Sequence, residues 1–552
     1  MNLKGFTYFV LLIFLVNCSV KDKDNHSENT IIYEITPVPL DDRVNLTVKT
    51  TFQGNSNGIT TISLPDDKYG TDEIYRSIAE FTVSNGQVET VFGEPKKRVI
   101  HHQPSKVITI NYTISFDPKL SETSSFSPVI EPELFHFFYP QWMLTLSLEK
   151  KEYEFDLHFN NVPNNWVTFT NLSKTSENHF SIRTNLNDFK PFIAGGDYDY
   201  YKIESQGKPI NVIISHHFRD ELEMVEDIQT IINYQRQLFD FSENEHFLIS
   251  VTKRDGILAG TGIENAFVAL VRKGASNPDL LQLLAHETLH NWIPLMADIE
   301  RDKTGIGSEY ETEFFNEGIT SYAPRIMLLN QKLINRQQLV DMLNETLLKY
   351  SLNQHHTVNI DEIKKVDSLG LFDNVYEKVS YYRGDLLGFK WDNIIRKTTE
   401  NKENIEDFLY KIIQKALENK GEISFPDFFA IAETYGIDAK SDWDKHIRDG
   451  KHITLNDLGW LSNDYKLIQE RNTFFDKGFK SKKVENRQTI KEVYNNSNAQ
   501  KAGLREEMVI LKSEFNRNKP FASITVLDNS AQRTITYQPN IEVSYQKIIL
   551  KH

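Results

Sequence analysis

The sequence predicts an α+β protein of several domains. Short segments of alternating apolar and polar residues fill the first third of the chain, apolar residues at helical spacing dominate the middle, and the last stretch returns to alternation. A chain of 552 residues is also too long for a single hydrophobic core. We therefore expect domains over residues 28–203, 204–460 and 461–552, after a leader over residues 1–27.

The first 18 residues have the build of a bacterial secretory signal. Lys4 precedes an apolar run that ends in Leu15-Val16-Asn17-Cys18, an arrangement typical of a lipobox, although Asn17 stands where a small residue is usual. Cys18 is the single cysteine of the chain and cannot form an internal disulfide, so lipidation explains its position. An uncleaved anchor or an ordinary signal is the alternative.

Composition narrows the class of protein and its location. The net charge of −15 argues against nucleic-acid binding, and no apolar run long enough to span a membrane follows the signal. The polar stretch over residues 19–27 suits a tether. We expect a globular protein held by a lipid anchor in the bacterial cell envelope, at the outer membrane, the periplasmic face or the surface.

Residues 31–200 predict a β-sandwich. Apolar and polar residues alternate in short segments such as Asn45–Val48, Val107–Ile110 and Tyr153–Leu157. Turn residues, namely Gly, Asn, Asp and Pro, separate these segments. Further along, the spacing of apolar residues predicts a strand and several helices. The strand is expected over 247–252 and the helices over 221–239, 403–417 and 424–433.

A metal-binding pattern lies between Leu280 and Trp292, which reads LLQLLAHETLHNW. On a helix, His286 and His290 lie one turn apart and can hold one ion, while Glu287 flanks the pair as candidate general base. Imidazole is a good ligand of Zn²⁺, and three protein ligands leave a fourth position for a water. A chance match on a core helix, with histidines bonded to carbonyls, is the alternative.

The neighbouring residues support a helix at this pattern. Ser276 or Asn277 can cap its start, Pro278 and Asp279 suit its first turn, and Pro294 stops it beyond Trp292. Leucines leave it almost no polar face, so we expect the helix to be buried in its domain.

A third metal ligand is expected from the following segment. Only Glu317 among its glutamates sits in an Asn-Glu-Gly triplet, and His-Glu-x-x-His followed by Asn-Glu-Gly resembles the gluzincin metallopeptidases, in which that glutamate is the third zinc ligand. The 317 − 290 − 1 = 26 residues between His290 and Glu317 exceed the usual spacing of the aminopeptidase N branch. The longer loop and Trp292 are similar to the glycyl aminopeptidase branch. The candidate glutamates are Glu309, Glu311, Glu313 and Glu317.

Gly260–Asn265 resembles the Gly-x-x-Glu-Asn element of gluzincin aminopeptidases. The resemblance implies an edge strand over the zinc, in which Gly262 and Asn265 line the substrate and Glu264 holds its free amino terminus. Thr261 replaces one glycine of that element. A Gly-rich turn with a solvated Glu264 is the alternative.

Tyr381-Tyr382-Arg383-Gly384 precedes an apolar helix that reaches Ile395. Tyr-x-Lys/Arg-Gly before such a helix resembles the family element whose first tyrosine stabilises the oxyanion, which corresponds to Tyr381. A phenol can donate a hydrogen bond to developing negative charge without titrating near neutrality. Tyr382, or a packed aromatic pair, is the alternative.

The last 90 or so residues look like a PDZ domain. The segment Ile490–Val493 is similar to a strand of that domain, and Ser497–Leu504 is similar to its helix and Ala-Gly-Leu turn. The next strand would correspond to Val509-Ile510. Glu507-Met508 stand where Gly-Asp is expected, and no carboxylate-binding loop is evident. A C-terminal PDZ domain is a mark of the glycyl aminopeptidase branch.

Together the motifs imply a thermolysin-like zinc peptidase domain with a helical lobe, between an N-terminal β-sandwich and a PDZ-like domain. The expected function is that of a zinc-dependent aminopeptidase acting on peptides with a free N-terminus. A preference for N-terminal Gly or Ala is implied by the resemblance alone. A zinc endopeptidase with the same core and a catalytically silent peptide-binding envelope protein are the alternatives.

Overall fold

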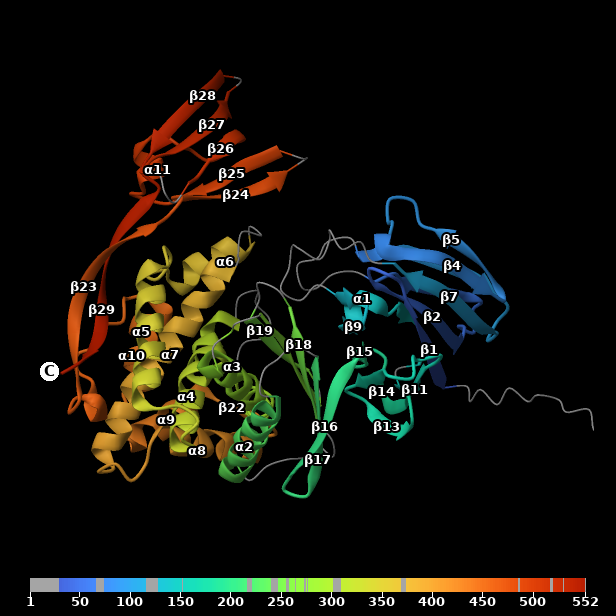
Figure 1. The fold of residues 1–552 in the computed structure, drawn as a ribbon, viewed down its shortest axis with the longest axis horizontal. Coiled ribbons are helices and arrows are strands. Elements are labelled where there is room, and N and C mark those ends of the chain that lie inside the picture. Colours follow the sequence, from blue (N-terminus) through green and yellow to red (C-terminus); the bar gives the residue numbers. More distant parts are fainter. Residues whose placement is uncertain are drawn as a thin grey trace, which may run out of the picture. The chain divides into compact units, whose positions relative to one another are not determined.

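The protein forms two compact units, Met1–Gly196 and Asp197–His552, in the computed structural model (Figure 1). Cys18 and Glu264 lie outside the described residues, so their roles in lipidation and substrate binding stay predictions. The domain boundaries expected at 203 and 460 also stay predictions. The structure describes residues 29–551 without 66–73, 116–127, 151, 216–220, 240–246, 255–257, 264, 273–274, 276, 301–308, 369–373, 485–486, 517–519 and 530.

The first unit consists mainly of β-strands. Its seven-stranded sheet has the order β13-β14-β11-β1-β2-β7-β4, and only the pairing of β1 with β11 is parallel among the described strands of that sheet. Two four-stranded sheets, β10-β3-β6-β5 and β12-β15-β9-β8, accompany it. The elements are β1 (Thr30–Pro39), β2 (Val44–Gln53), β3 (Ile59–Ser63), η1 (Ile74–Ser77), β4 (Ile78–Ser84), β5 (Gly86–Thr90), β6 (Lys97–His102), β7 (Val107–Ile114), β8 (Val129–Glu131), β9 (Leu134–Phe137), α1 (Tyr139–Trp142), β10 (Thr145–Ser147), β11 (Glu152–Phe159), β12 (Val167–Thr170), β13 (Ser173–Ser176), β14 (His179–Asn185) and β15 (Ile193–Gly196).

Side chains from different sheets of this unit meet in one hydrophobic core. Tyr33 of β1 and Phe155 of β11 come from the seven-stranded sheet, whereas Ile62 of β3 and Ile100 of β6 come from a four-stranded one. The rings of Phe155 and Phe189 stack with centroids 3.8 Å apart and 8° between planes. The sheets thus share one core, and the β-sandwich that the alternating sequence predicts over residues 31–200 stays a prediction.

The second unit begins with a five-stranded sheet of order β16-β17-β18-β20-β19. Strands β17, β18 and β20 run parallel, while β16 and β19 run antiparallel to their neighbours. Helix α2 contacts β16, and α3 contacts both β19 and β20. Strand β19 is therefore an edge strand beside α3. The elements are β16 (Tyr198–Ser205), β17 (Lys208–Ser215), α2 (Glu221–Phe239), β18 (Phe247–Lys253), β19 (Leu258–Ile263), β20 (Ala266–Val271) and α3 (Asn277–Leu289).

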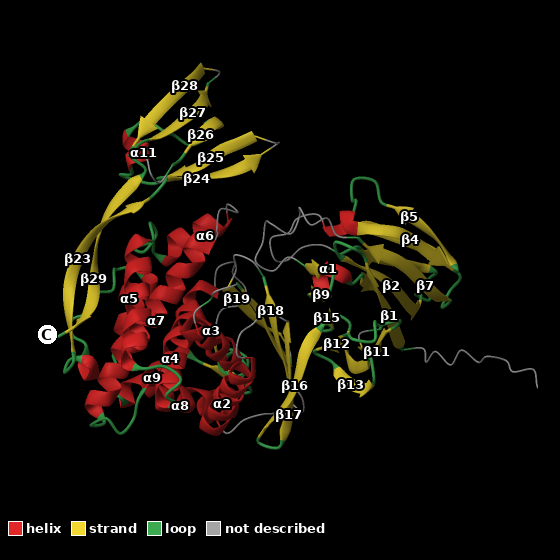
Figure 2. Cartoon of the chain, in the orientation of Figure 1, coloured by secondary structure: helices red, strands yellow, loops and turns green. Residues whose placement is uncertain are grey.

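A helical region follows the sheet (Figure 2). Helices α4 and α7 contact each other and each contacts both α5 and α8, and the apolar side chains of these helices belong to the same core as those of the sheet. The helices predicted over 403–417 and 424–433 correspond to α8 and α9. The elements are β21 (Asp298–Ile299), η3 (Glu309–Glu311), η4 (Phe314–Ile319), α4 (Thr320–Asn330), α5 (Arg336–Leu352), α6 (Ile360–Ser368), α7 (Asn374–Thr398), α8 (Ile405–Glu418), β22 (Glu422–Ile423), α9 (Phe425–Thr434), α10 (Ala439–Asp442), η5 (Trp443–Arg448) and η6 (Gly459–Leu461).

The position of the Tyr381–Gly384 motif relative to its helix differs from the prediction. The sequence places the motif before a helix, but α7 begins at Asn374 and contains all four residues. Glycine weakens a helix interior by about 0.8–1 kcal/mol relative to alanine. The sequence therefore favours a helix that begins after Gly384. In the fold Gly384 lies against the backbone of Gly318, a contact that requires a residue without a side chain.

The C-terminal residues form a β-ribbon and a small sheet. Strands β23 and β29 pair antiparallel over their whole length, and β29 contacts α5. The chain between these two strands forms a sheet of order β24-β25-β26-β27-β28 and the short helix α11. Peptide binding of the PDZ type stays a prediction. No described helix is long and apolar enough to cross a membrane. The elements are β23 (Tyr465–Phe475), β24 (Phe479–Val484), β25 (Arg487–Val493), α11 (Asn498–Lys501), β26 (Val509–Glu514), β27 (Ala522–Asp528), β28 (Ala531–Tyr537) and β29 (Asn540–Leu550).

Candidate active site

Helix α3 positions the two histidines of the metal-binding pattern. Leu281, Leu284 and Ala285 on this helix are buried in the core of the second unit. His286 lies in the last turn of α3, and His290 follows the helix in a turn whose backbone N–H donates to the carbonyl of Glu287. The helix ends at Leu289, before the predicted end at Trp292, and this does not separate the two imidazoles. Their ring centroids are 4.7 Å apart.

Glu317 joins the two histidines from the π-helix η4. Its Oε2 lies 3.3 Å from Nε2 of His286 and 3.5 Å from Nε2 of His290. The two Nε2 atoms are 3.3 Å apart. One ligand atom from each residue thus falls within 4.8 Å of the others. The structure brings together the three residues that the sequence predicts as metal ligands, despite the long segment between His290 and Glu317.

Backbone carbonyls fix the orientation of both imidazoles. Nδ1 of His286 lies 2.9 Å from the carbonyl oxygen of Thr320, and Nδ1 of His290 lies 2.7 Å from that of Ile293. A carbonyl oxygen can only accept, so each Nδ1 carries a proton and Nε2 is the ring atom that faces the cluster. Two Nε2 atoms and a carboxylate that face one another form a donor set for a cation.

The charge of Glu317 controls the electrostatics of this cluster. Burial raises the pKa of Glu317, but the contacts with His286 and His290 outweigh it and hold the pKa well below its usual range. Burial lowers the pKa of His290, but the Glu317 carboxylate outweighs this effect and raises the pKa to about 9. The site therefore holds Glu317 ionised and attracts positive charge.

Glu287 lies against the edge strand β19. A Cβ atom on Gly260 would lie 3.0 Å from Cγ of Glu287, so the strand passes directly over this side chain. Burial raises the pKa of Glu287, while the nearby imidazoles of His286 and His290 lower it to a smaller degree. A half-buried carboxylate with a raised pKa is suited to accept and release a proton.

The substrate-binding residues predicted around β19 lie partly within the described structure. Gly262 is on β19, and a Cβ atom there would lie 3.9 Å from the carbonyl oxygen of Glu287 and 4.0 Å from Cβ of His290. Asn265 has a φ of 60°, and its carbonyl accepts from the N–H of Leu248. Because β19 is an edge strand, a peptide could pair with its outer side.

Two glycines bring Tyr381 to the cluster. A Cβ atom on Gly384 would lie 2.5 Å from Cα of Gly318, and one on Gly318 would lie 2.8 Å from the carbonyl oxygen of Ser380. Helix α7 and η4 therefore touch through their backbones. The Tyr381 ring centroid lies 6.4 Å from that of His286, and burial followed by the Glu317 charge raises the pKa of Tyr381.

Tyr382 has different surroundings. It packs against the core of the second unit, and burial together with Glu345 and Asp385 raises its pKa. Tyr381 is thus the tyrosine that interacts electrostatically with a residue of the metal-binding cluster, Glu317. The sequence alone left both open.

A buried ion pair supports α7 from behind. Arg325 of α4 contacts Asp385 of α7 through two nitrogens, at 2.8 and 3.0 Å. The hydroxyl of Thr346 on α5 donates to the same carboxylate over 2.5 Å. Asp385 directly follows Gly384, so this pair fixes α7 next to the motif. No sequence motif indicates this pair, because partners on three helices leave no local pattern.

Lys378 is a second residue of this region that no sequence motif indicates. Its Nζ lies 3.5 Å from the centroid of the Tyr381 ring. The signal available in the sequence was a lysine three positions before Tyr381, which places it one helical turn away.

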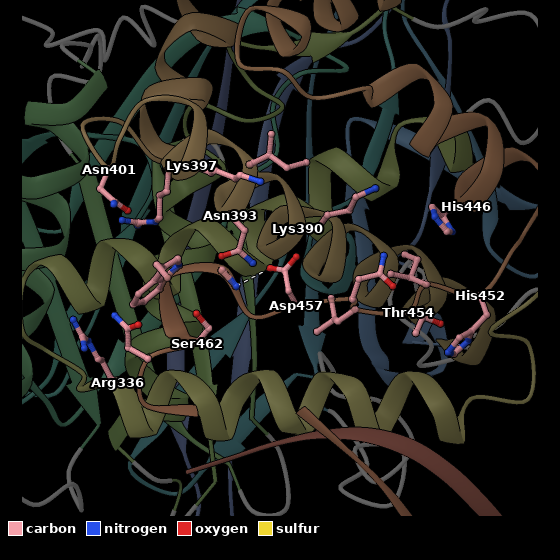
Figure 3. A pocket seen from close by; sticks show the side chains of 18 of the residues that line it. Arg336, Lys390, Asn393, Lys397, Asn401, His446, His452, Thr454, Asp457 and Ser462 are labelled. Atoms are coloured by element: carbon pink, nitrogen blue, oxygen red, sulfur yellow. Dashed lines mark hydrogen bonds between the residues drawn. The ribbon is translucent and has the colours of Figure 1, made fainter. Parts of the chain in front are cut away.

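A separate cavity of about 1010 Å³ lies elsewhere in the second unit (Figure 3). Helix α7 contributes Lys390 and Lys397 to its wall, and Arg336 comes from α5. None of the metal-binding cluster lines this cavity, so it is distinct from the candidate active site.

Comparisons with known proteins agree with the motif. Residues 279–410 match the family model of the M61 glycyl aminopeptidases. No curated protein matches the chain. A crystal structure of an aminopeptidase N family protein from Idiomarina loihiensis has a TM-score of 0.68 at 16% identity, covering 95% of this chain and 98% of that one. At this identity the likeness shows a shared fold.

Two crystal structures of an M1 zinc metallopeptidase from Deinococcus radiodurans are more distant. The one bound to a Tyr-Ser-Ala substrate has a TM-score of 0.43 at 12% identity, and the other has a TM-score of 0.42 at 10% identity. Each covers 78% of this chain, with 95% and 94% of the respective neighbour covered. The family match supports a peptidase acting on peptide substrates. It confirms, for the region that carries the candidate active site, that the chain resembles the glycyl aminopeptidase family.

Proposed function

We propose that this protein is a zinc-dependent aminopeptidase. The observation that carries the proposal is the arrangement of His286, His290 and Glu317, whose ligand atoms lie within 4.8 Å of one another with Nε2 of both rings turned inward. Two imidazoles and one carboxylate form a donor set that suits Zn²⁺ and leaves room for a further ligand. When bound, zinc would supply Lewis-acid activation of a water and of the substrate carbonyl.

The other residues of the site divide the remaining chemistry. Glu287 would accept a proton from the attacking water and deliver it to the leaving amine, for which its raised pKa is suited. Tyr381 would donate its phenolic hydrogen to the oxyanion of the tetrahedral intermediate. The raised pKa keeps this phenol protonated throughout the physiological range.

Removal of N-terminal residues, as opposed to cleavage within chains, would depend on β19 and the residues after it. The outer edge of β19 lies over Glu287, and a substrate paired with it would present its backbone to the site. We propose that Glu264 holds the α-amino group at the end of this strand. Gly262 and Asn265 would line the same path, and the preference for N-terminal Gly or Ala follows from the family alone.

We also propose that the enzyme works in the bacterial cell envelope, anchored through a lipid on Cys18. The isolated cysteine behind an apolar segment supports this. The C-terminal sheet β24–β28 with α11 would be a PDZ-like domain, and its ligand would be peptide.

The proposal is tested by hydrolysis of aminoacyl reporter substrates with and without a metal chelator. We expect turnover that stops on chelation and returns with zinc, and no turnover by the Glu287→Gln variant. N-acetylation of a peptide substrate should abolish most of its cleavage, whereas efficient cleavage of acetylated peptides would favour the endopeptidase. Stoichiometric zinc without turnover of any peptide would favour the silent binding protein.

A further inference from the structure

Lys378 lies beside the candidate active site and has no part in the reaction described above. Its Nζ is 3.5 Å from the centroid of the Tyr381 ring. The two residues are three positions apart on α7, so their side chains lie on one face of the helix. The charge of Lys378 also reaches Glu287, where it opposes the larger effect of burial on the pKa. Lys378 is therefore within electrostatic range of two groups of the site.

The surroundings of Lys378 are acidic. Burial has the largest effect on the pKa of Tyr381, and the carboxylates of Glu317, Glu377 and Glu313 raise it further. Among the residues that the structure describes, none forms an ion pair with Lys378. An ammonium group has three donors, and the ring of Tyr381 satisfies none of them as a carboxylate would. Within the described part of the chain, the donors of Lys378 are thus free for a ligand.

We propose that Lys378 binds a carboxylate of the substrate on the carboxyl-terminal side of the scissile bond. This inference rests on the proposed function. The substrate's α-ammonium group would be repelled by Lys378 and attracted by the glutamates, so the cation must face the other end of the peptide. For a carboxylate close to the scissile bond, Lys378 would offset the repulsion from Glu317, Glu377 and Glu313.

The reach of the side chain limits which carboxylates qualify. In a dipeptide the free carboxylate is one residue beyond the scissile nitrogen, and one residue spans roughly 3.3–3.6 Å. Lys378 packs on the ring whose hydroxyl is proposed to contact the scissile carbonyl oxygen, so a group one residue away is within its range. Two sources fit: the C-terminal carboxylate of a dipeptide, and the side chain of an aspartate or glutamate directly after the scissile bond.

Four dipeptide substrates separate these sources. Ala-Ala has a free carboxylate, Ala-Ala amide has none, and Ala-Asp amide carries one on its side chain only. Ala-Asn amide is the neutral match of the last. A charge-assisted hydrogen bond of this kind corresponds to a preference of about ten- to a hundred-fold in kcat/KM. The full-length zinc-loaded protein is expected to prefer Ala-Ala over Ala-Ala amide, or Ala-Asp amide over Ala-Asn amide, by that factor.

The variant Lys378→Met keeps the length of the side chain and removes its charge. We expect the ratio of kcat/KM between the charged and the amidated substrate to fall to about one, because the lost contact exists only for a carboxylate, whereas any effect of the charge on Tyr381 or Glu287 acts on both substrates alike. Lys378→Arg should retain most of the preference. Lys397→Met is the matched control, since Lys397 is on the same helix but lines the separate cavity (Figure 3).

A binding measurement gives a readout apart from turnover. In the Glu287→Gln background, calorimetric titration with Ala-Ala should give a Kd about tenfold or more higher when Lys378→Met is added, while the Kd for Ala-Ala amide stays nearly constant.

Equal losses for charged and amidated substrates in Lys378→Met would overturn the carboxylate contact and make Lys378 a general support of Tyr381. Hydrolysis by the parent protein with no preference for either charged substrate would also overturn it, and would leave the proposed peptidase function standing. Absence of hydrolysis for every peptide would refute the proposed function and this inference together.

Discussion

Gly318 and Gly384 meet backbone to backbone, and this contact joins the segment that carries Glu317 to the helix that carries Tyr381. A Cβ atom on Gly384 would lie 2.5 Å from Cα of Gly318. Real Cβ atoms do not approach backbone so closely, and neither segment can move without displacing Glu317 or Tyr381. The two glycines therefore set the distance between a proposed metal ligand and the proposed oxyanion donor.

We predict that Gly384→Ala lowers both stability and turnover. Alanine would favour the helix by about 0.8–1 kcal/mol, so any loss of stability must come from the contact with Gly318. Overpacking of this kind costs about 1–3 kcal/mol or more, because backbone atoms cannot turn aside. The Tm of thermal unfolding and the kcat should both fall. A variant with raised Tm and unchanged kcat would show that the contact is not needed. Lys397→Ala, on the exposed side of α7, is the control.

His290→Ala should remove most of the bound zinc. The variant lacks one of three ligands, and the remaining pair holds zinc far more weakly. Metal analysis after dialysis would measure this, with His452→Ala as a control outside the cluster. Stoichiometric zinc in His290→Ala would contradict the assignment of this ligand.

Glu287→Gln should keep its zinc and lose nearly all turnover. An amide has the shape of the carboxylate but cannot accept a proton from water, and general-base catalysis is typically worth about 10²–10⁴-fold. The measurement is kcat at matched zinc content. A rate within a few-fold of the parent would exclude Glu287 as the base.

Glu406 predicts a specific pH dependence of stability. Burial raises its pKa to about 7 despite hydrogen bonds from Tyr234, Asn404 and Asn330. The folded protein thus binds a proton more tightly than the unfolded chain, so the cost of ionising Glu406 is absent below about pH 4.5 and complete above about pH 7. Stability contributed by this group falls as pH rises through that window, by roughly 3 kcal/mol at most.

Glu406→Gln tests this dependence. The hydroxyl of Tyr234 lies 3.0 Å from Oε2, and Asn330 donates to the same oxygen, so an amide that places its oxygen there can keep both contacts. We expect the variant to gain free energy of unfolding relative to the parent at pH 8 and to gain little at pH 5. Denaturant unfolding of the variant and the parent at both pH values gives the difference in free energy of unfolding between the two proteins. The contributions of other titrating groups cancel in this difference. An equal effect at both values would contradict the raised pKa.

The pair Arg325–Asp385 should be costly to break from one side. Both residues are buried, so Arg325→Met leaves an unpaired carboxylate and should destabilise the protein by about 3–5 kcal/mol. The double variant Arg325→Met, Asp385→Leu should recover much of this loss, since it removes the buried charge as well. No recovery in the double variant would mean that packing, and not the unpaired charge, dominates.

The parts of the site that the sequence predicts are those with local patterns. His286 and Glu287 lie on one helix and His290 directly follows its end, so their mutual placement follows from near-helical geometry over a single turn. Glu317 could be selected among four glutamates only through the family motif, because a long segment separates it from His290 and its position depends on how η4 packs against α7.

The parts that the sequence does not predict depend on contacts between distant segments. Gly384 favours a helix start by propensity, and only the contact with Gly318 explains why α7 continues through it. Lys378 has no motif, and its relevance comes from the ring that it packs on. Strand alternation predicted the sheets of the first unit but not their order, because the pairing of β1 with β11 joins segments more than a hundred residues apart.

The ribbon of β23 and β29 has a consequence for how the protein can be made and shortened. Tyr465 of β23 and Ile548 of β29 both belong to the core that contains α3, so the helical core is completed only after the intervening strands have been synthesised. During translation that core would stay open longer than its order in the chain suggests. The same geometry makes the small sheet an insertion between paired strands. Replacing residues 477–538 by a short turn would keep both strands of the ribbon and yield a smaller catalytic protein, whereas simple removal of everything after residue 476 would take Ile548 out of the core.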